Sequence, residues 1–115
     1  MEKNGALSTL SALGHENRID IFRLLIGAGK HGLLPGDIAQ KLDLKSNTLS
    51  AHLSVLASSG LVEFERQGRN IRYFARMESM GLLLRYLMED CCGGSRDVSE
   101  GVFARLGLPP GCNKA

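Results

Sequence analysis

The stretch Ser46–Gly60, SNTLSAHLSVLASSG, decides the fold because it combines a helical apolar stripe with an unusual polar side. Leu49, Leu53 and Leu56 recur at helical spacing, which places them on one face of a helix. The opposite side carries short, uncharged side chains, and His52 is the only titratable residue of the stretch. Because a solvated helix face usually carries lysine and glutamate, this bare polar side indicates a specialised surface.

That polar side has the composition of a surface that reads DNA bases. A helix in the major groove must come close to base edges, and small side chains that donate and accept hydrogen bonds allow this. We therefore expect a recognition helix, although a serine-rich surface helix is the alternative if the neighbouring segments do not fit. The residues expected at the DNA are Asn47, Thr48, Ser50, Ala51, His52 and Ser54. For His52, a contact to the DNA backbone and a packing role both remain open.

The segment before this stretch predicts the first helix of a helix-turn-helix. Pro35 suits the first helical position, and Asp37 lies in the first turn, where the helix dipole favours an acidic residue. Small Ala39 lets a second helix cross closely. The short connection Asp43–Lys45 then leads to Ser46, which we expect to be the N-cap of the recognition helix.

The segment after the stretch predicts a β-hairpin. Leu61–Arg66 and Ile71–Arg76 alternate apolar and polar residues, and the turn-forming residues Gln67–Asn70 join them. A hairpin that follows a helix-turn-helix is a wing. Three arginines at or near its tip concentrate positive charge where DNA phosphates would pass. These expected DNA contacts, for which a purely solubilising role is the alternative, are Arg66, Arg69 and Arg72.

Apolar helices flank this unit on both sides. Leu7, Leu10 and Leu13 indicate a first helix that ends at Gly14, and His15–Ile26 reads as a second helix. The inward face expected for the second helix consists of Ile19, Phe22, Leu25 and Ile26.

A long final helix is expected over Met77–Cys92, and it is apolar around most of its circumference. One side can pack on its own domain, and the other needs a partner. An isologous homodimer through the N- and C-terminal helices is the simplest solution. The predicted fold is thus mainly α with a small β-hairpin, a winged helix-turn-helix. Its domain spans residues 5–92, and residues 93–115 form a C-terminal tail that carries Cys112.

Length and composition agree with a single small globular domain. The chain has 115 residues, of which 43% are hydrophobic and 23% charged, and a formal net charge of +2 permits nucleic-acid binding without demanding it. The sequence has no apolar run long enough for a membrane span and no signal-peptide pattern. We therefore expect a cytoplasmic protein with no membrane partner, in which cysteines stay as thiols.

Enzymatic chemistry is not expected from the motifs. Gly27–Gly32, GAGKHG, formally matches a dinucleotide fingerprint, but it follows a helix instead of a strand. Ser50 and His52 are two residues apart on a helix, so their side chains do not face each other. No constitutive cofactor is indicated either.

Three stretches together resemble the arsenic-repressor (ArsR) family of winged-helix transcriptional regulators. They are ALGHENRIDIFRLL, GDIAQKLDLKSNTLSAHLSVLASSGLV and RQGRNIRYFA, and the resemblance covers roughly residues 5 to 90. It implies a dimeric repressor that binds a double-stranded DNA operator and releases it when a metal or metalloid ion binds. The founding members carry a paired-cysteine box before the recognition helix, whereas Leu33–Ile38 contains no thiol here.

The cysteines lie instead at Cys91, Cys92 and Cys112, which resembles family members with relocated C-terminal metalloid sites. Three thiolates suit trivalent arsenic, a soft ion, so arsenite is the expected inducer, with an organoarsenical or antimonite as related choices. Adjacent cysteines hardly form an unstrained disulfide, yet both can ligate one ion. All three histidines precede the last helix, so a zinc site on that helix would have no imidazole.

Three alternatives remain at the level of the sequence. The thiols can make the protein a redox-responsive repressor, with Cys112 pairing with one of the adjacent cysteines. Cys91 alone can be structural, because it continues an apolar stripe. A winged helix that binds only proteins is the third alternative.

Overall fold

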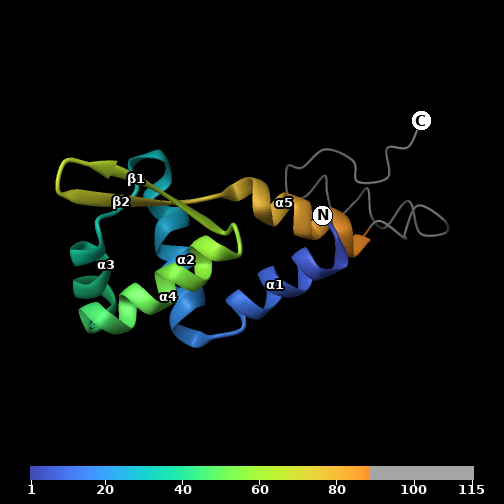
Figure 1. Cartoon of the computed structure of the whole chain (residues 1–115), viewed down its shortest axis with the longest axis horizontal. Coiled ribbons are helices and arrows are strands. Elements are labelled where there is room, and N and C mark those ends of the chain that lie inside the picture. Colours follow the sequence, from blue (N-terminus) through green and yellow to red (C-terminus); the bar gives the residue numbers. More distant parts are fainter. Residues whose placement is uncertain (89–115) are drawn as a thin grey trace.

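A central helix, α2 (Glu16–Ala28), organises the structure because α1, α3, α4 and β2 all pack against it. The computed structural model describes residues 1–88, so Cys91, Cys92, Cys112 and the predicted tail lie outside the described residues. The remaining elements, shown in Figure 1, are α1 (Lys3–Leu13), the short 3₁₀ turn η1 (Gly29–His31), α3 (Pro35–Leu42), α4 (Ser46–Ser58), β1 (Val62–Gln67), β2 (Asn70–Ala75) and α5 (Met77–Met88). This order confirms the predicted winged helix-turn-helix.

The core forms where α2, α3 and α4 meet. Leu49, Leu53 and Leu56 of α4 are all at most 2% exposed, which confirms the apolar stripe predicted for this helix. The inward face predicted for α2 was wrong in one place. Ile19 is 42% exposed, whereas Ile21 is fully buried. Because α2 is apolar on several sides and is packed by four elements, its sequence does not determine which side faces the core.

The turn of the helix-turn-helix ends α3 with a left-handed residue. Asp43 caps α3 with φ of 53°, a conformation that aspartate tolerates better than most residues. Pro35 occupies the first turn of α3, as predicted. The N-cap of α4 is Lys45, not Ser46, and it makes no side-chain cap bond. The side-chain Oδ1 of Asn47 instead accepts a hydrogen bond from the backbone N–H of Thr48 at 2.9 Å.

The wing is a two-stranded antiparallel hairpin with a tighter turn than predicted. Gln67 pairs with Asn70, so only Gly68 and Arg69 form the turn, and Gly68 takes a positive φ of 67°. Each strand is therefore shifted by one residue from the sequence prediction.

The wing is also attached to the body of the domain. Leu33 exchanges two backbone hydrogen bonds with Tyr73 of β2, with N···O distances of 2.9 and 2.8 Å. The chain reaches this pairing through Gly32, which has φ of 62°. A Cβ at Gly32 would lie 2.5 Å from the Tyr73 carbonyl oxygen and 2.7 Å from the Phe74 ring, so only glycine fits here.

The helices α1 and α5 lie side by side at the end of the domain away from the wing (Figure 1). On α1, small residues face inward, while Leu7 and Leu10 are 54% and 42% exposed. On α5, Leu83 is buried, while Leu82 and Leu87 remain exposed. The two helices thus present an outward apolar surface. Within residues 1–88, no helix is long and apolar enough to cross a membrane.

Candidate DNA-binding surface

The polar side of α4 is open to solvent. The core stripe holds the helix against α2 and α3, so the residues between the leucines point outward. Five of the six residues predicted to contact DNA from this helix are exposed: Asn47, Thr48, Ser50, Ala51 and Ser54. No charged residue lies among them, so hydrogen-bond donors and acceptors dominate the accessible surface. Such a face can approach base edges without burying an unpaired charge.

His52 is placed differently from the other five residues. It is half-buried, and its ring lies against the His15 ring with a centroid distance of 4.6 Å. Its Nδ1 is 3.5 Å from Nη1 of Arg18. Burial is the main reason why the pKa of His52 is lowered from its ordinary value of 6.5, and His15 and Arg18 lower it further. Of the two roles left open by the sequence, packing against α2 is the one with contacts in the structure.

The three wing arginines divide into two kinds. Arg66 and Arg69 are exposed, with Arg69 in the turn itself. Arg72 is only partly exposed, and its guanidinium is already engaged: Nε donates to Oε1 of Gln67 at 3.0 Å, and Nη1 donates to the His31 carbonyl oxygen at 3.1 Å. Arg72 therefore holds the wing against η1, and Arg66 and Arg69 are the better candidates for phosphate contacts.

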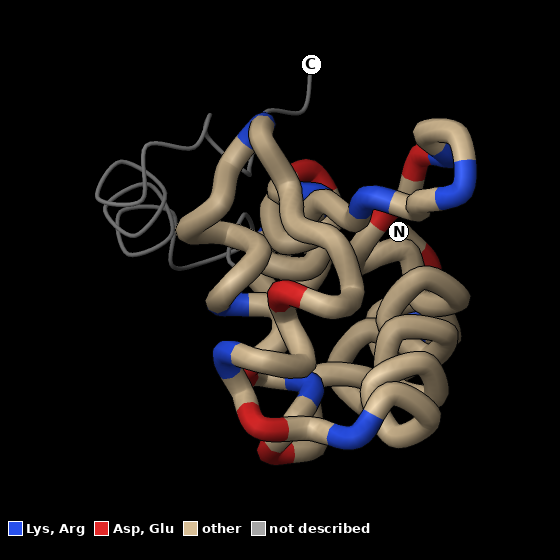
Figure 2. Tube along the Cα trace, turned by 90° about the vertical axis from the view of Figure 1, so that its left-hand side faces the viewer, with Lys and Arg blue, Asp and Glu red and all other residues tan. Residues whose placement is uncertain are grey.

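Charge is dispersed over the described part of the molecule. In Figure 2 the blue and red segments alternate along the tube and do not form one large basic block. On β1, Glu63 and Glu65 share the strand with Arg66. The expected attraction for DNA is therefore local and concentrated at the tip of the wing.

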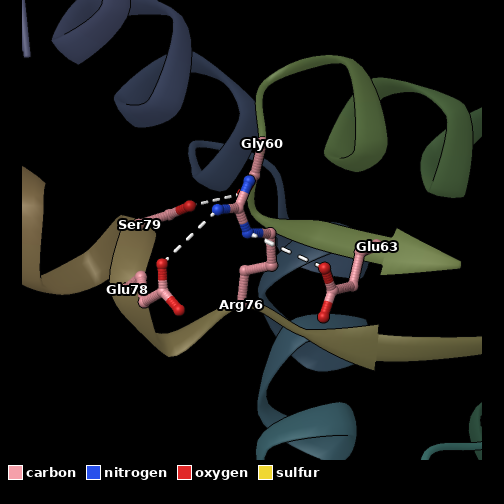
Figure 3. A network of polar contacts seen from close by, with 5 residues as sticks. All are labelled: Gly60, Glu63, Arg76, Glu78 and Ser79. Atoms are coloured by element: carbon pink, nitrogen blue, oxygen red, sulfur yellow. Dashed lines mark hydrogen bonds and ion pairs between the residues drawn. The ribbon is translucent and has the colours of Figure 1, made fainter.

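A network of polar contacts joins the end of α4 to the start of α5 (Figure 3). The Ser79 hydroxyl donates to the Gly60 carbonyl oxygen, and the Arg76 backbone N–H donates to the Leu61 carbonyl oxygen at 2.8 Å. The Arg76 guanidinium also lies 3.9 Å from the Glu63 carboxylate and 3.6 Å from that of Glu78. This junction was not predicted from the sequence, because most of its partners are far apart in the chain and no local pattern marks them.

Metal-binding groups do not cluster in the described residues. Among residues 1–88, no group of three or more histidine, cysteine, aspartate or glutamate side chains could hold an ion. The predicted ligands Cys91, Cys92 and Cys112 lie outside this part of the chain, so they stay predictions.

Comparison with known proteins agrees with this architecture. Residues 13–64 match a family model described as a helix-turn-helix domain. The transcriptional activator HlyU of Vibrio cholerae is 32% identical over 75 residues, which cover 64% of this chain and 67% of that protein.

Two solved structures extend the likeness. An ArsR-like transcriptional regulator from Rhodococcus has a TM-score of 0.68 and 26% identity, and the match covers 91% of this chain and 94% of that one. Reduced HlyU from Vibrio cholerae has a TM-score of 0.59 and 25% identity, with coverage of 76% and 87%.

The fold and the exposed recognition helix define a DNA-binding transcriptional regulator of the winged helix-turn-helix class, not an enzyme. Within that class, the chain belongs to the ArsR-type family that includes HlyU. The resemblance noted in the sequence is thereby confirmed.

Replacing Arg69 with alanine should weaken binding to every DNA sequence by a similar factor. A phosphate contact carries no base information, and its loss should lower the slope of log K against log salt by about one. Fluorescence anisotropy across a salt series measures this slope. Lys3→Ala, which removes an exposed lysine at the far end of the domain from the wing, is the control that should leave the slope unchanged. An unchanged slope for Arg69→Ala would show that the wing turn does not contact DNA phosphates.

Proposed function

We propose that this protein is a homodimeric transcriptional repressor that binds an operator and releases it when trivalent arsenic binds to its cysteine thiolates. The exposed, uncharged face of α4 carries the DNA-reading part of this proposal. In it, Asn47, Ser50 and Ala51 contact bases, and Arg66 and Arg69 contact phosphates.

A dimer accounts for the apolar surface of α1 and α5. Leu7 and Leu10 on α1 and Leu82 and Leu87 on α5 are each more than 40% exposed. An isologous interface through these helices would bury them in both copies. It would also place two recognition helices for half-sites about one DNA turn apart, roughly 34 to 36 Å.

Cys91 and Cys92 follow α5 directly in the sequence, and Cys112 lies further along. Two adjacent thiolates can bind one soft ion, and Cys112 from either subunit would complete the three-thiolate set that arsenite prefers. Two thiolates alone would be enough to coordinate a monomethylated arsenical.

The junction at the start of α5 supplies a route from the thiols to the DNA. The carbonyl oxygens of Gly60 and Leu61, which follow α4, accept hydrogen bonds from Ser79 and Arg76. A movement of α5 would therefore displace the end of the recognition helix. In a dimer, a small rotation of α5 changes the distance between the two recognition helices. Both half-sites then no longer fit at once, and affinity falls by the coupling energy, typically about 1 to 3 kcal/mol.

A thiol-redox regulator is the second candidate. It is favoured by the likeness to HlyU, one structure of which is of the reduced protein. In this version, peroxide takes two electrons and two protons from the thiols of Cys112 and either Cys91 or Cys92, so a disulfide forms and the peroxide is reduced to water. The same junction transmits the change.

An anisotropy titration on DNA from the protein's own promoter distinguishes the two candidates. The reduced protein is mixed with labelled DNA and titrated with sodium arsenite, with zinc and with peroxide in separate experiments. We expect arsenite to release the DNA and zinc to leave it bound. Release by peroxide combined with indifference to arsenite would instead establish the redox candidate.

A further inference from the structure

The contacts of His52 suggest a second link to the recognition helix, independent of the α5 junction. Arg18, on α2, reaches two other elements at once. Its Nε donates to the carbonyl oxygen of Ala12 at 2.7 Å, near the end of α1, and its Nη1 lies 3.5 Å from Nδ1 of His52 on α4. One guanidinium therefore connects α1 to the middle of the recognition helix.

The protonation state of His52 follows from this geometry. Because arginine has only donors and stays charged, this contact is a hydrogen bond when Nδ1 of His52 is the acceptor and carries no proton. His52 is then neutral, with its proton on Nε2. Protonation would place an N–H at Nδ1 opposite the guanidinium, which removes the hydrogen bond and sets two cations side by side.

His15 reinforces the same arrangement from the cap of α2. Its side chain accepts a hydrogen bond from the Asn17 backbone N–H at 3.1 Å, which fixes its ring against that of His52. Three causes lower the pKa of His52: burial is the largest, followed by His15 and Arg18. The helix α4 itself has no other titratable side chain.

We infer that Arg18 and neutral His52 are positioning residues for operator reading, and that protonation of His52 lowers the discrimination between operator and other DNA. This inference rests on the proposed recognition of an operator by α4. It deepens that function by naming what sets the position of the helix, since neither residue needs to touch a base. The link also connects α1, a helix of the proposed dimer interface, to the DNA-reading surface.

The sign of the pH effect is set by the lowered pKa. Above 6.5, His52 is neutral in both the folded and the unfolded chain, and the contact is intact. As the pH falls below 6.5, the unfolded chain takes up the proton first, so the stability of the fold is lost progressively. The placement of α4 changes only at a lower pH, where His52 of the folded protein is itself protonated. Added positive charge also strengthens attraction to all DNA phosphates, so bare affinity is an ambiguous readout. The ratio of affinities for operator and scrambled duplex removes this general effect.

The test measures that ratio at about pH 7.5 and at the lowest pH at which circular dichroism shows the protein folded, at fixed ionic strength, on an operator selected from random duplexes. For the wild type, we expect the ratio to fall by about fivefold or more at the lower pH. His52→Asn keeps an acceptor where Nδ1 stood but does not titrate, so its ratio should stay high at both values. Arg18→Gln should give a low ratio at both values. Arg23→Gln, which replaces an exposed arginine on the same helix, should behave as the wild type.

The outcomes separate the two levels of the proposal. Equal affinity of the wild type for both duplexes at about pH 7.5 would contradict operator recognition, and this inference with it. Clear discrimination that does not change with pH would overturn the inference alone, as would a wild-type pH profile in His52→Asn. Thermal melting of each variant, followed by circular dichroism at both pH values, checks that the compared proteins are folded.

Discussion

Replacing Cys91 and Cys92 together with serine is expected to give a protein that stays on its operator at arsenite concentrations that release the wild type. Serine is close to cysteine in size but has no thiolate, and a hydroxyl is a poor ligand for a soft ion. Since the proposed DNA-binding residues lie within 46–69, affinity without arsenite should equal that of the wild type. The change is therefore a loss of response, measured by anisotropy with increasing arsenite.

Cys112→Ser is the matched comparison for this experiment. It leaves the adjacent pair intact, so the response to arsenite should need a higher concentration, while the response to a monomethylated arsenical should be retained. If the double serine variant still releases DNA with arsenite, the inducer site lies at other residues. If only peroxide distinguishes it from the wild type, the redox candidate replaces the metalloid one.

Replacing Gly32 with alanine is expected to destabilise the fold strongly. The new methyl group would overlap the Tyr73 carbonyl oxygen and the Phe74 ring, and the positive φ of Gly32 is unfavourable for alanine. The Leu33–Tyr73 pairing that attaches the wing would have to open. We expect a loss of unfolding free energy of about 3 kcal/mol or more.

Urea denaturation of Gly32→Ala measures this loss. The control is Gly27→Ala, in which nothing lies within 4 Å of the added carbon and the glycine is in the last turn of α2. There alanine should be neutral or stabilising by up to about 1 kcal/mol, because it restricts the unfolded chain. Equal stability of the two variants would show that the wing is not held at this point.

Local patterns sufficed to predict the elements. The stripe of Leu49, Leu53 and Leu56, the Pro35 start of α3 and the alternation in the wing each depend on near neighbours, and each was confirmed. The start of α4 and the hairpin register were each shifted by one residue from the prediction. Alternative helix caps or turn registers differ from one another in free energy by less than a formed element differs from an unformed one.

The site was predictable only where exposure follows from helix phase. Asn47, Ser50 and Ser54 had to point away from a leucine stripe, and they do. The roles of His52 and Arg72 depend on Arg18 and His31, which lie 34 and 41 residues away in the chain, so no local pattern could reveal them. The burial of Ile21 in place of Ile19 likewise depends on how several elements surround α2.

The most direct test of base reading by α4 is the affinity of the Asn47→Ala/Ser50→Ala variant for the selected operator and for a scrambled duplex. Both positions are exposed, and Ser58→Ala, also exposed but at the far end of α4, is the control. We expect the variant to lose about tenfold or more on the operator and to change by less than about twofold on the scrambled duplex. Equal losses on both duplexes, or no loss on either, would contradict a base-reading role for this face.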